Sequence, residues 1–210
     1  MFTDNDFNTK KILHQLFLRY KNRMNTDAWA DGQIKSKMWL CRELERLAKP
    51  KDPIIYILGG WYGVLAHTLF IREKLKPKFI YSFDIDAEAN KMAMLVNNAF
   101  TFKPQRFQSM YADCTHVDWF DRDLPKPDIV INTACEHFSD EWLNAVPSHT
   151  LLVLQSTNMI HDDHKFNVAS VDEMRSRFNV FSKIKFSGEL FFDYSPDPSF
   201  SRYMLIGTKK

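Results

Sequence analysis

The stretch IIYILGGWYGVLAHTLFIREKLKPKFIYSFDID, residues 54–86, contains the pattern from which the fold follows. It begins with a short apolar run at 54–58 that lacks polar alternation, as expected for a strand buried on both faces. Two glycines end this run, and apolar residues then recur at helical spacing from Val64 to Ile71. A second apolar run at 79–83 precedes two aspartates. We therefore predict a strand, a glycine turn, a helix and a second strand.

The alternation of strands and helices continues along the chain. We predict a helix at 87–98 and further strands at 106–111, 128–132 and 150–155. Such alternation implies right-handed crossovers and a parallel sheet with helices on both faces. Two strand-like runs, 181–192 and 202–208, are joined only by a turn region, SPDPSFS, and indicate an antiparallel hairpin. The predicted fold is α/β: a doubly wound, mostly parallel seven-stranded sheet with a C-terminal antiparallel hairpin.

Two helices are predicted before the first strand. Apolar residues recur at three-and-four spacing in residues 9–24 and again in residues 36–48. Ser36 is the candidate cap of the second helix. We therefore divide the chain into an N-terminal helical extension, residues 1–50, and an α/β domain, residues 51–210.

The composition narrows the class of protein. The 210 residues are 45% hydrophobic and 26% charged, as in one ordinary globular domain. Three cysteines, far apart, provide neither a disulfide framework nor the spacing of a zinc site. No apolar run approaches the ~18 residues of a membrane span, and the polar, acidic start does not resemble a signal peptide. We expect a cytoplasmic protein with no membrane partner, and the oligomeric state stays open.

The residues that follow the first two strands are candidates for binding a nucleoside. In an open parallel sheet, ligands bind outside the carboxyl ends of the strands. Here the first strand is followed by Gly59 and Gly60, where the backbone can turn sharply and approach a ligand, and then by a helix N-terminus. Asp84 comes about twenty residues later, where doubly wound folds place a ribose-binding carboxylate. The alternative role for Asp84 is a helix cap, which Asp86 can supply by itself.

Polar side chains also follow the third and fourth strands. Asp113 can accept a hydrogen bond from an exocyclic amine, with Cys114 beside a purine ring. The alternative is that Asp113 caps its own turn. After the fourth strand, a polar run from Asn132 to His137 lies where a substrate would meet a cofactor.

These motifs resemble the class I, Rossmann-like S-adenosylmethionine-dependent methyltransferases over about residues 50–208. The family's first motif matches IYILGGWYGVLA, its second FDID, its third YADCTHVDWF, and its fourth-strand stretch DIVINTACEHFSDEWL. The closing hairpin is like the family's last two strands. The resemblance implies S-adenosylmethionine as cofactor and a lid or substrate-selecting role for residues 1–50. The cofactor-binding residues that it implies are Gly59, Gly60, Trp61, Gly63, Asp84, Ile85, Asp113, Cys114 and Asn132.

Two positions depart from the family's first motif. Ile57 replaces an acidic residue that lies near the methionine part of the cofactor, and Trp61 replaces the central glycine. The indole could stack along the ligand, swing outward or fill the pocket. If it filled the pocket, the chain would be a non-catalytic binding or interaction protein on this fold. A third alternative is another group transfer from the same cofactor, such as aminopropyl transfer.

Methyl transfer is an in-line displacement, so the protein mainly positions the acceptor and excludes water, and a base helps if the acceptor atom carries a proton. The candidate catalytic residues are Glu136, His137 and His161. The run His161-Asp162-Asp163-His164 contains a plausible set of metal ligands, but its spacing is not diagnostic. Such loop residues are more often solvated or cap the next segment, and we assign no metal.

The acceptor is left as a small molecule, RNA or protein. The loop after the fourth strand lacks the N-P-P-Y or D-P-P-Y run of enzymes that methylate exocyclic base amines. No basic stripe alternates with aromatic residues, so a nucleic-acid partner is not favoured.

Overall fold

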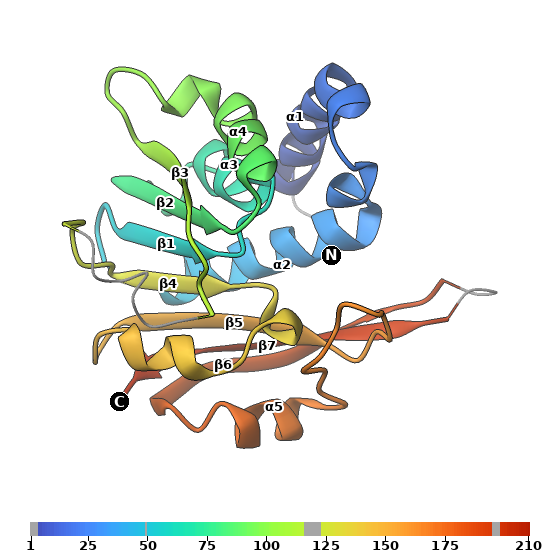
Figure 1. The fold of residues 1–210 in the computed structure, drawn as a ribbon, viewed down its shortest axis with the longest axis vertical. Coiled ribbons are helices and arrows are strands. Elements are labelled where there is room, and N and C mark those ends of the chain that lie inside the picture. Colours follow the sequence, from blue (N-terminus) through green and yellow to red (C-terminus); the bar gives the residue numbers. More distant parts are fainter. Residues whose placement is uncertain (1–3, 49, 116–122, 195–197) are drawn as a thin grey trace.

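The computed structural model describes residues 4–48, 50–115, 123–194 and 198–210. Its seven-stranded sheet has the order β3-β2-β1-β4-β5-β7-β6, and only β7 runs antiparallel to its neighbours (Figure 1). The strands are β1 (Ile54–Leu58), β2 (Phe79–Asp84), β3 (Phe107–Tyr111), β4 (Ile129–Asn132), β5 (Leu151–Thr157), β6 (Phe181–Phe192) and β7 (Phe200–Lys209). The predicted fold class is confirmed.

The strand order places a switch point at β1. Leu58, the last residue of β1, pairs with Phe83 of β2 on one side and with Asn132 of β4 on the other. The loops after these three strands therefore begin side by side at one edge of the sheet, where open α/β sheets bind ligands.

Three helices cover one face of the sheet: α2 (Asp31–Leu47), α3 (Val64–Ile71) and α4 (Ala87–Val96). Leu40 and Leu44 of α2 are fully buried in the same core as the strands. Helix α2 begins well before the predicted start, and the prediction that Ser36 caps it was wrong. Ser36 lies inside α2, where its hydroxyl donates to Oε1 of Gln155 over 3.1 Å. Ser36 therefore provides a hydrogen-bond donor to the buried side-chain amide of Gln155 in the distant strand β5.

Helix α1 (Asp4–Tyr20) packs against α2 and α3 and continues into the short helices η1 (Lys21–Arg23) and η2 (Thr26–Trp29). The buried carboxylate of Asp6 accepts from Nη1 of Arg72 over 2.5 Å, and the same guanidinium binds Glu45 of α2. Leu13 adds an apolar contact with Met38 and Val64. A buried ion pair and an apolar cluster therefore fix α1 in place. No described helix is long and apolar enough to cross a membrane.

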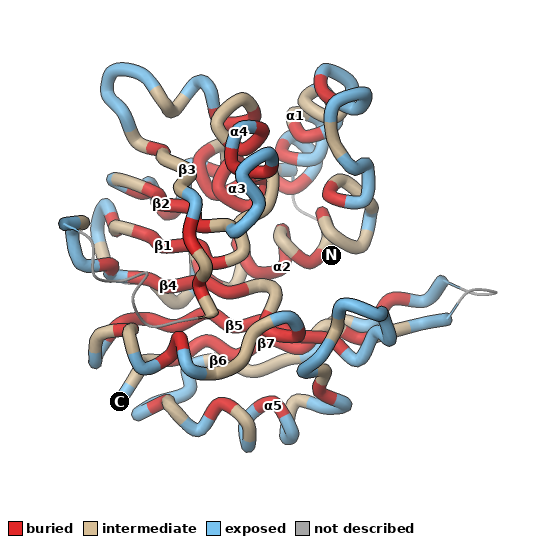
Figure 2. Tube along the Cα trace, in the orientation of Figure 1, coloured by how far each residue is buried: buried red, intermediate tan, exposed pale blue. Residues whose placement is uncertain are grey.

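The other face of the sheet is covered differently from the prediction. Among the described residues, the connection from β4 to β5 contains two 3-10 helices, η5 (Cys135–His137) and η6 (Glu141–Ala145), and no α-helix. Helix α5 (Val171–Arg177), which the sequence did not predict, packs on this face of the sheet together with Phe178. Trp142 of η6 is fully buried in the core on this face. Figure 2 shows the buried strands between these two layers.

Candidate functional site

A cavity of about 790 Å³ opens at the carboxyl ends of β1, β2 and β4. This volume lies within the usual range for small-molecule sites. The candidate residues that line it are Gly59, Gly60, Trp61, Asp84, Ile85, Asp113, Cys114, Glu136, His137 and His161. Gly63 and Asn132 do not line it. Residues far apart in the sequence are thus gathered around one space.

The glycine turn after β1 is required by the packing of the chain itself. Gly59 and Gly63 have φ of +62° and +69°, which favour glycine. A Cβ on Gly60 would lie 1.8 Å from the hydroxyl of Ser82, and one on Gly63 would lie 2.5 Å from Nδ2 of Asn97. The backbone of the turn therefore packs directly against Ser82 of β2 and against Asn97 at the end of α4. Close approach to a ligand, the reason expected from sequence, is not needed to explain these glycines.

Trp61 forms part of the cavity wall. It has a φ of +45°, and its ring stacks on Tyr62 with centroids 4.9 Å apart and planes at 24°. The Tyr62 hydroxyl accepts the backbone N–H of Asn25 over 3.2 Å, which links this wall to the N-terminal segment. The indole does not fill the pocket, because a cavity of about 790 Å³ remains beside it.

Asp84 lies at the end of β2 and faces the glycine turn. Its Oδ2 accepts the N–H of Trp61 over 2.7 Å, and its Oδ1 accepts the N–H of Asp86 over 3.0 Å. Burial raises the pKa of Asp84 above its usual value, and these hydrogen bonds oppose that shift. Asp86 caps α4 by accepting from Glu88 and Ala89, so Asp84 is not the cap. A carboxylate has about four acceptor positions, so these hydrogen bonds leave capacity to accept from a ligand.

The polar side chains expected near the cofactor after β3 and β4 form hydrogen bonds within their own loops. Oδ1 of Asp113 accepts from the N–H and the hydroxyl of Thr115, over 2.9 and 2.6 Å, which is the capping alternative. Cys114 is buried at the cavity wall. Oδ1 of Asn132 accepts the N–H of Ala134 over 2.9 Å and shapes the turn after β4. The rest of the motif YADCTHVDWF, residues 116–120, lies outside the described residues.

Glu136 is the most deeply buried carboxylate in the cavity wall, with 1% of the residue exposed. Its Oε1 accepts from Nη1 of Arg202 over 2.9 Å, and that nitrogen also donates to the carbonyl of Thr133. Its Oε2 is buried and has no hydrogen-bond partner among the described groups. An unpaired buried carboxylate oxygen is costly, so it is a candidate for binding a ligand.

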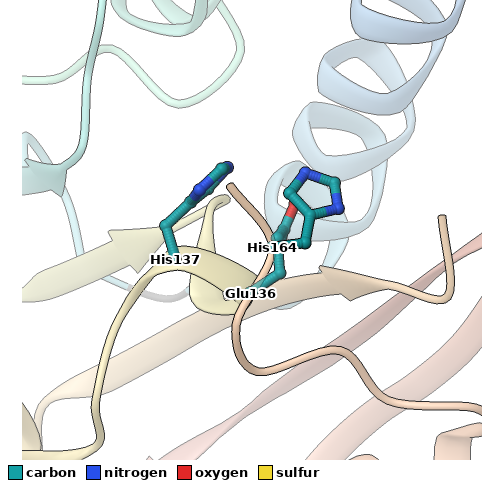
Figure 3. A group of neighbouring side chains, drawn as sticks. All are labelled: Glu136, His137 and His164. Atoms are coloured by element: carbon teal, nitrogen blue, oxygen red, sulfur yellow. The ribbon is translucent and has the colours of Figure 1, made fainter. Parts of the chain in front are cut away.

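Two histidines lie next to this carboxylate (Figure 3). His137 follows Glu136 in η5, and His164 comes from the segment after β5, with ring centroids 4.8 Å apart. His161 lies 5.3 Å from His164 by ring centroids and is exposed. The three sequence-predicted catalytic candidates, Glu136, His137 and His161, come from two loops and lie around His164.

Arg177, which the sequence analysis did not identify, holds the two loops together from the end of α5. Its guanidinium donates to the carbonyls of Cys135, Phe138 and Phe166, and it pairs with Asp140 over 2.7 Å. The first two carbonyls flank Glu136 and His137, and the third follows His164. No sequence pattern marks this role, because the carbonyl partners are defined only by the folded loops.

Lys37 of α2 is a second residue that the sequence analysis missed. It lines the cavity, and its ammonium donates to Oε1 of Gln33 over 2.6 Å. Burial lowers the pKa of Lys37 to about 7, helped by the charge of Arg202 and opposed by Asp27. It lies on the helical stripe that the sequence analysis treated only as core packing. The position brings an amine that titrates near neutral pH into the cavity.

No family model matches the chain, and no curated protein matches its sequence. Solved structures do match its fold. A protein from Thermoplasma acidophilum has a TM-score of 0.66 at 11% identity and covers 99% of this chain and 98% of its own. The magnesium protoporphyrin IX methyltransferase from Synechocystis, with bound S-adenosylhomocysteine, has a TM-score of 0.61 at 12% identity, covering 95% of this chain and 94% of its own.

TrmK from M. capricolum, solved with its cofactor product S-adenosylhomocysteine, has a TM-score of 0.55 at 12% identity. It covers 81% of this chain and 67% of its own. The chain therefore has the fold of class I methyltransferases, which confirms the resemblance found in the sequence at the level of the fold.

Proposed function

We propose that this protein is a methyltransferase that uses S-adenosylmethionine. The observation that carries the proposal is the position of Asp84, a partly desolvated carboxylate at the end of β2 that faces both the glycine turn and the cavity. Two vicinal ribose hydroxyls are the donors that suit such a carboxylate. The fold shared with known methyltransferases supports the same assignment, although fold alone does not establish an activity.

The described residues fit the cofactor. Asp84 can accept from the ribose, and the stacked rings of Trp61 and Tyr62 form an aromatic wall. Lys37 and Arg202 provide positive charge in the cavity, which suits the carboxylate of a methionine group. Ile57 contributes no charge, so recognition of the ammonium would fall to another acid in the wall. When bound, the cofactor supplies an electrophilic methyl group on a sulfonium.

The chain's own residues would then position the acceptor. Glu136, His137 and His161 lie together at the end of the cavity formed by the loops after β4 and β5. The segment between α1 and α2 contributes Asn25 and Asp27 to the wall, which supports the proposed lid or substrate-selecting role of residues 1–50. Exclusion of water and alignment of the acceptor are the main contributions expected of such a site.

Binding of S-adenosylhomocysteine tests the proposal directly. At a hundred times its dissociation constant, a ligand of the native state adds about 2.7 kcal/mol to the free energy of unfolding. We expect a thermal shift with S-adenosylhomocysteine and S-adenosylmethionine and none with adenosine monophosphate at the same concentration. If neither cofactor form shifts the transition at millimolar concentration, the cofactor assignment is refuted and the alternative of a non-catalytic binding protein on this fold is favoured. Isolation of a methylated product would separate methyl transfer from aminopropyl transfer.

A further inference from the structure

We propose that Glu136, His137 and His164 bind one divalent transition-metal ion at the acceptor end of the cavity. One ligand atom from each residue lies within 4.8 Å of the other two. Figure 3 shows the two imidazoles and the carboxylate gathered from the turn after β4 and the segment after β5. Zn²⁺ binds nitrogen and oxygen at metal–ligand distances of about 2.0–2.2 Å, so the three ligand atoms would move toward one another to bind a single ion.

A backbone carbonyl orients each imidazole through its Nδ1 atom. Nδ1 of His137 lies 3.0 Å from the carbonyl oxygen of Asp163, and Nδ1 of His164 lies 2.8 Å from that of Met159. A carbonyl oxygen only accepts, so in each pair Nδ1 carries the hydrogen. In the neutral form of each ring, this arrangement leaves the lone pair on Nε2. Metal-binding histidines commonly donate their other N–H to a backbone carbonyl in this way.

The carboxylate provides the second, independent observation. Oε2 of Glu136 is buried and unpartnered, although Oε1 is paired with Arg202. Leaving a buried carboxylate oxygen without a partner costs free energy, and a bound cation would remove that cost. The charge of the described part of the cavity also favours a cation. Among the described residues, its walls carry six carboxylates, Asp27, Asp84, Asp86, Asp113, Glu136 and Asp163, against two basic side chains, Lys37 and Arg202.

The two loops that provide the ligands are fixed to each other before any ion binds. The carbonyl oxygen of Glu136 accepts the backbone N–H groups of Lys165 and Phe166, over 3.0 and 2.9 Å. Arg177 adds hydrogen bonds to carbonyls on both sides, as described above. Preorganisation of this kind lowers the entropy cost of bringing the three ligands together.

The ligand set indicates the class of metal. Two imidazoles and one carboxylate suit Zn²⁺, Fe²⁺, Mn²⁺ or Co²⁺, whereas Mg²⁺ and Ca²⁺ prefer oxygen ligands only. Three protein ligands leave coordination positions open, as in catalytic rather than structural sites. Because all three ligands line the cavity, those open positions are available to a molecule bound within it.

The metal site specifies the chemical class of the acceptor, an inference that rests on the proposed methyl transfer. A metal ion binds a hydroxyl oxygen and lowers its pKa, so that the hydroxyl loses its proton to solvent. The alkoxide or phenolate oxygen then forms a bond to the methyl carbon as the carbon–sulfur bond breaks. The products are a methyl ether and neutral S-adenosylhomocysteine. The acceptor is thus an oxygen nucleophile, such as an alcohol or phenol with a second oxygen nearby.

Titration of the chelator-treated full chain with Co²⁺, followed by the visible absorption of the bound ion, tests the site without any assay of activity. We expect one Co²⁺ per chain and displacement by Zn²⁺. The variants His137→Gln, His164→Gln and Glu136→Gln should each weaken Co²⁺ binding by at least about a hundredfold, since even outer-shell changes cost tenfold to a hundredfold. The two histidine variants keep the test informative if loss of the Glu136 charge prevents folding.

Two matched controls separate this cluster from nearby alternatives. His14→Gln removes an exposed imidazole from α1, and Asp162→Asn alters the HDDH run outside the cluster; both should leave the Co²⁺ affinity unchanged. Acetohydroxamate, a small oxygen chelator, should change the spectrum of the Co²⁺-loaded protein by entering open positions. Absence of stoichiometric Co²⁺ binding, or unchanged affinity in both histidine variants, overturns the proposal.

Binding of S-adenosylhomocysteine in the presence of chelator distinguishes this failure from failure of the proposed function. If S-adenosylhomocysteine binds but Co²⁺ does not, the methyltransferase assignment stands without the metal. In that case, weaker S-adenosylhomocysteine binding by Glu136→Gln would assign the unpartnered oxygen to the cofactor's ammonium group. If Co²⁺ binds but S-adenosylhomocysteine does not, the metal site stands and the methyl-transfer role falls.

Discussion

Replacement of Asp84 tests the cofactor site most directly, because this carboxylate both holds the glycine turn and faces the cavity. Asp84→Ala removes two hydrogen bonds, from the N–H groups of Trp61 and Asp86. At about 1 kcal/mol for each partly solvated bond, the free energy of unfolding should fall by about 2 kcal/mol. For a chain of this length, that loss corresponds to a decrease in Tm of roughly 4–8 °C. Asp84→Asn retains one acceptor oxygen and should lose about half as much.

The effect on the cofactor is separate from the effect on stability. Loss of a charge-assisted hydrogen bond to a ribose hydroxyl costs about 1.5–3 kcal/mol. Binding of S-adenosylhomocysteine, measured by calorimetry well below Tm, should therefore weaken roughly 10-fold to 150-fold in Asp84→Asn. Asp84→Ala should lose at least as much, because no acceptor oxygen remains.

Asp128→Asn provides a matched control for these measurements. Oδ2 of Asp128 also accepts a backbone N–H, that of Ile54, over 2.8 Å, but at the opposite end of β1. This variant should lose a comparable amount of stability to Asp84→Asn and keep its affinity for S-adenosylhomocysteine. A folded Asp84→Asn protein with unchanged affinity would refute the ribose assignment. Equal weakening in both variants would show that affinity follows stability rather than contact with the ligand.

Three further predictions concern residues that support the cavity. In Arg177→Gln, the shorter side chain cannot reach all of the carbonyl and carboxylate partners of the arginine. Titration with Co²⁺ should show binding that is weaker by about tenfold to a hundredfold, while binding of S-adenosylhomocysteine stays unchanged. Asp6→Asn should lower the free energy of unfolding, measured by urea denaturation, by about 3–5 kcal/mol, because the charged Arg72 guanidinium stays buried without this partner. Asp31→Asn, which breaks exposed ion pairs, is the control and should lower it by less than about 1 kcal/mol. Burial lowers the pKa of Lys37 to about 7 in the folded state. Between that pH and the ordinary lysine pKa, the unfolded chain therefore binds more protons than the folded chain. As the pH rises through this range, the wild-type protein should gain stability relative to Lys37→Met. Parallel pH–stability curves for the two proteins would contradict that assignment.

The sequence by itself determined the strands and the fold class. The apolar run 54–58 and the glycines after it are local signals, and the structure has strand β1 (Ile54–Leu58) at that position. Hydrophobic periodicity is a property of neighbouring residues, so it can be read without knowing the tertiary structure. Asp84 was identified in the same way, because doubly wound folds place that carboxylate at a nearly fixed distance along the chain.

The tertiary structure alone decided which side chains meet. His164 approaches Glu136 and His137 because neighbouring parallel strands β4 and β5 end at the same edge, and backbone hydrogen bonds then join the loops after them. Arg177 and Lys37 act through partners distant in sequence, and no local pattern encodes such pairings. Trp61 shows the same limit: the sequence left three orientations of the indole open, and only the folded turn shows that its ring stacks on Tyr62 in the cavity wall. Local physics selects helices and strands, whereas sites arise from contacts that exist only once the sheet has formed.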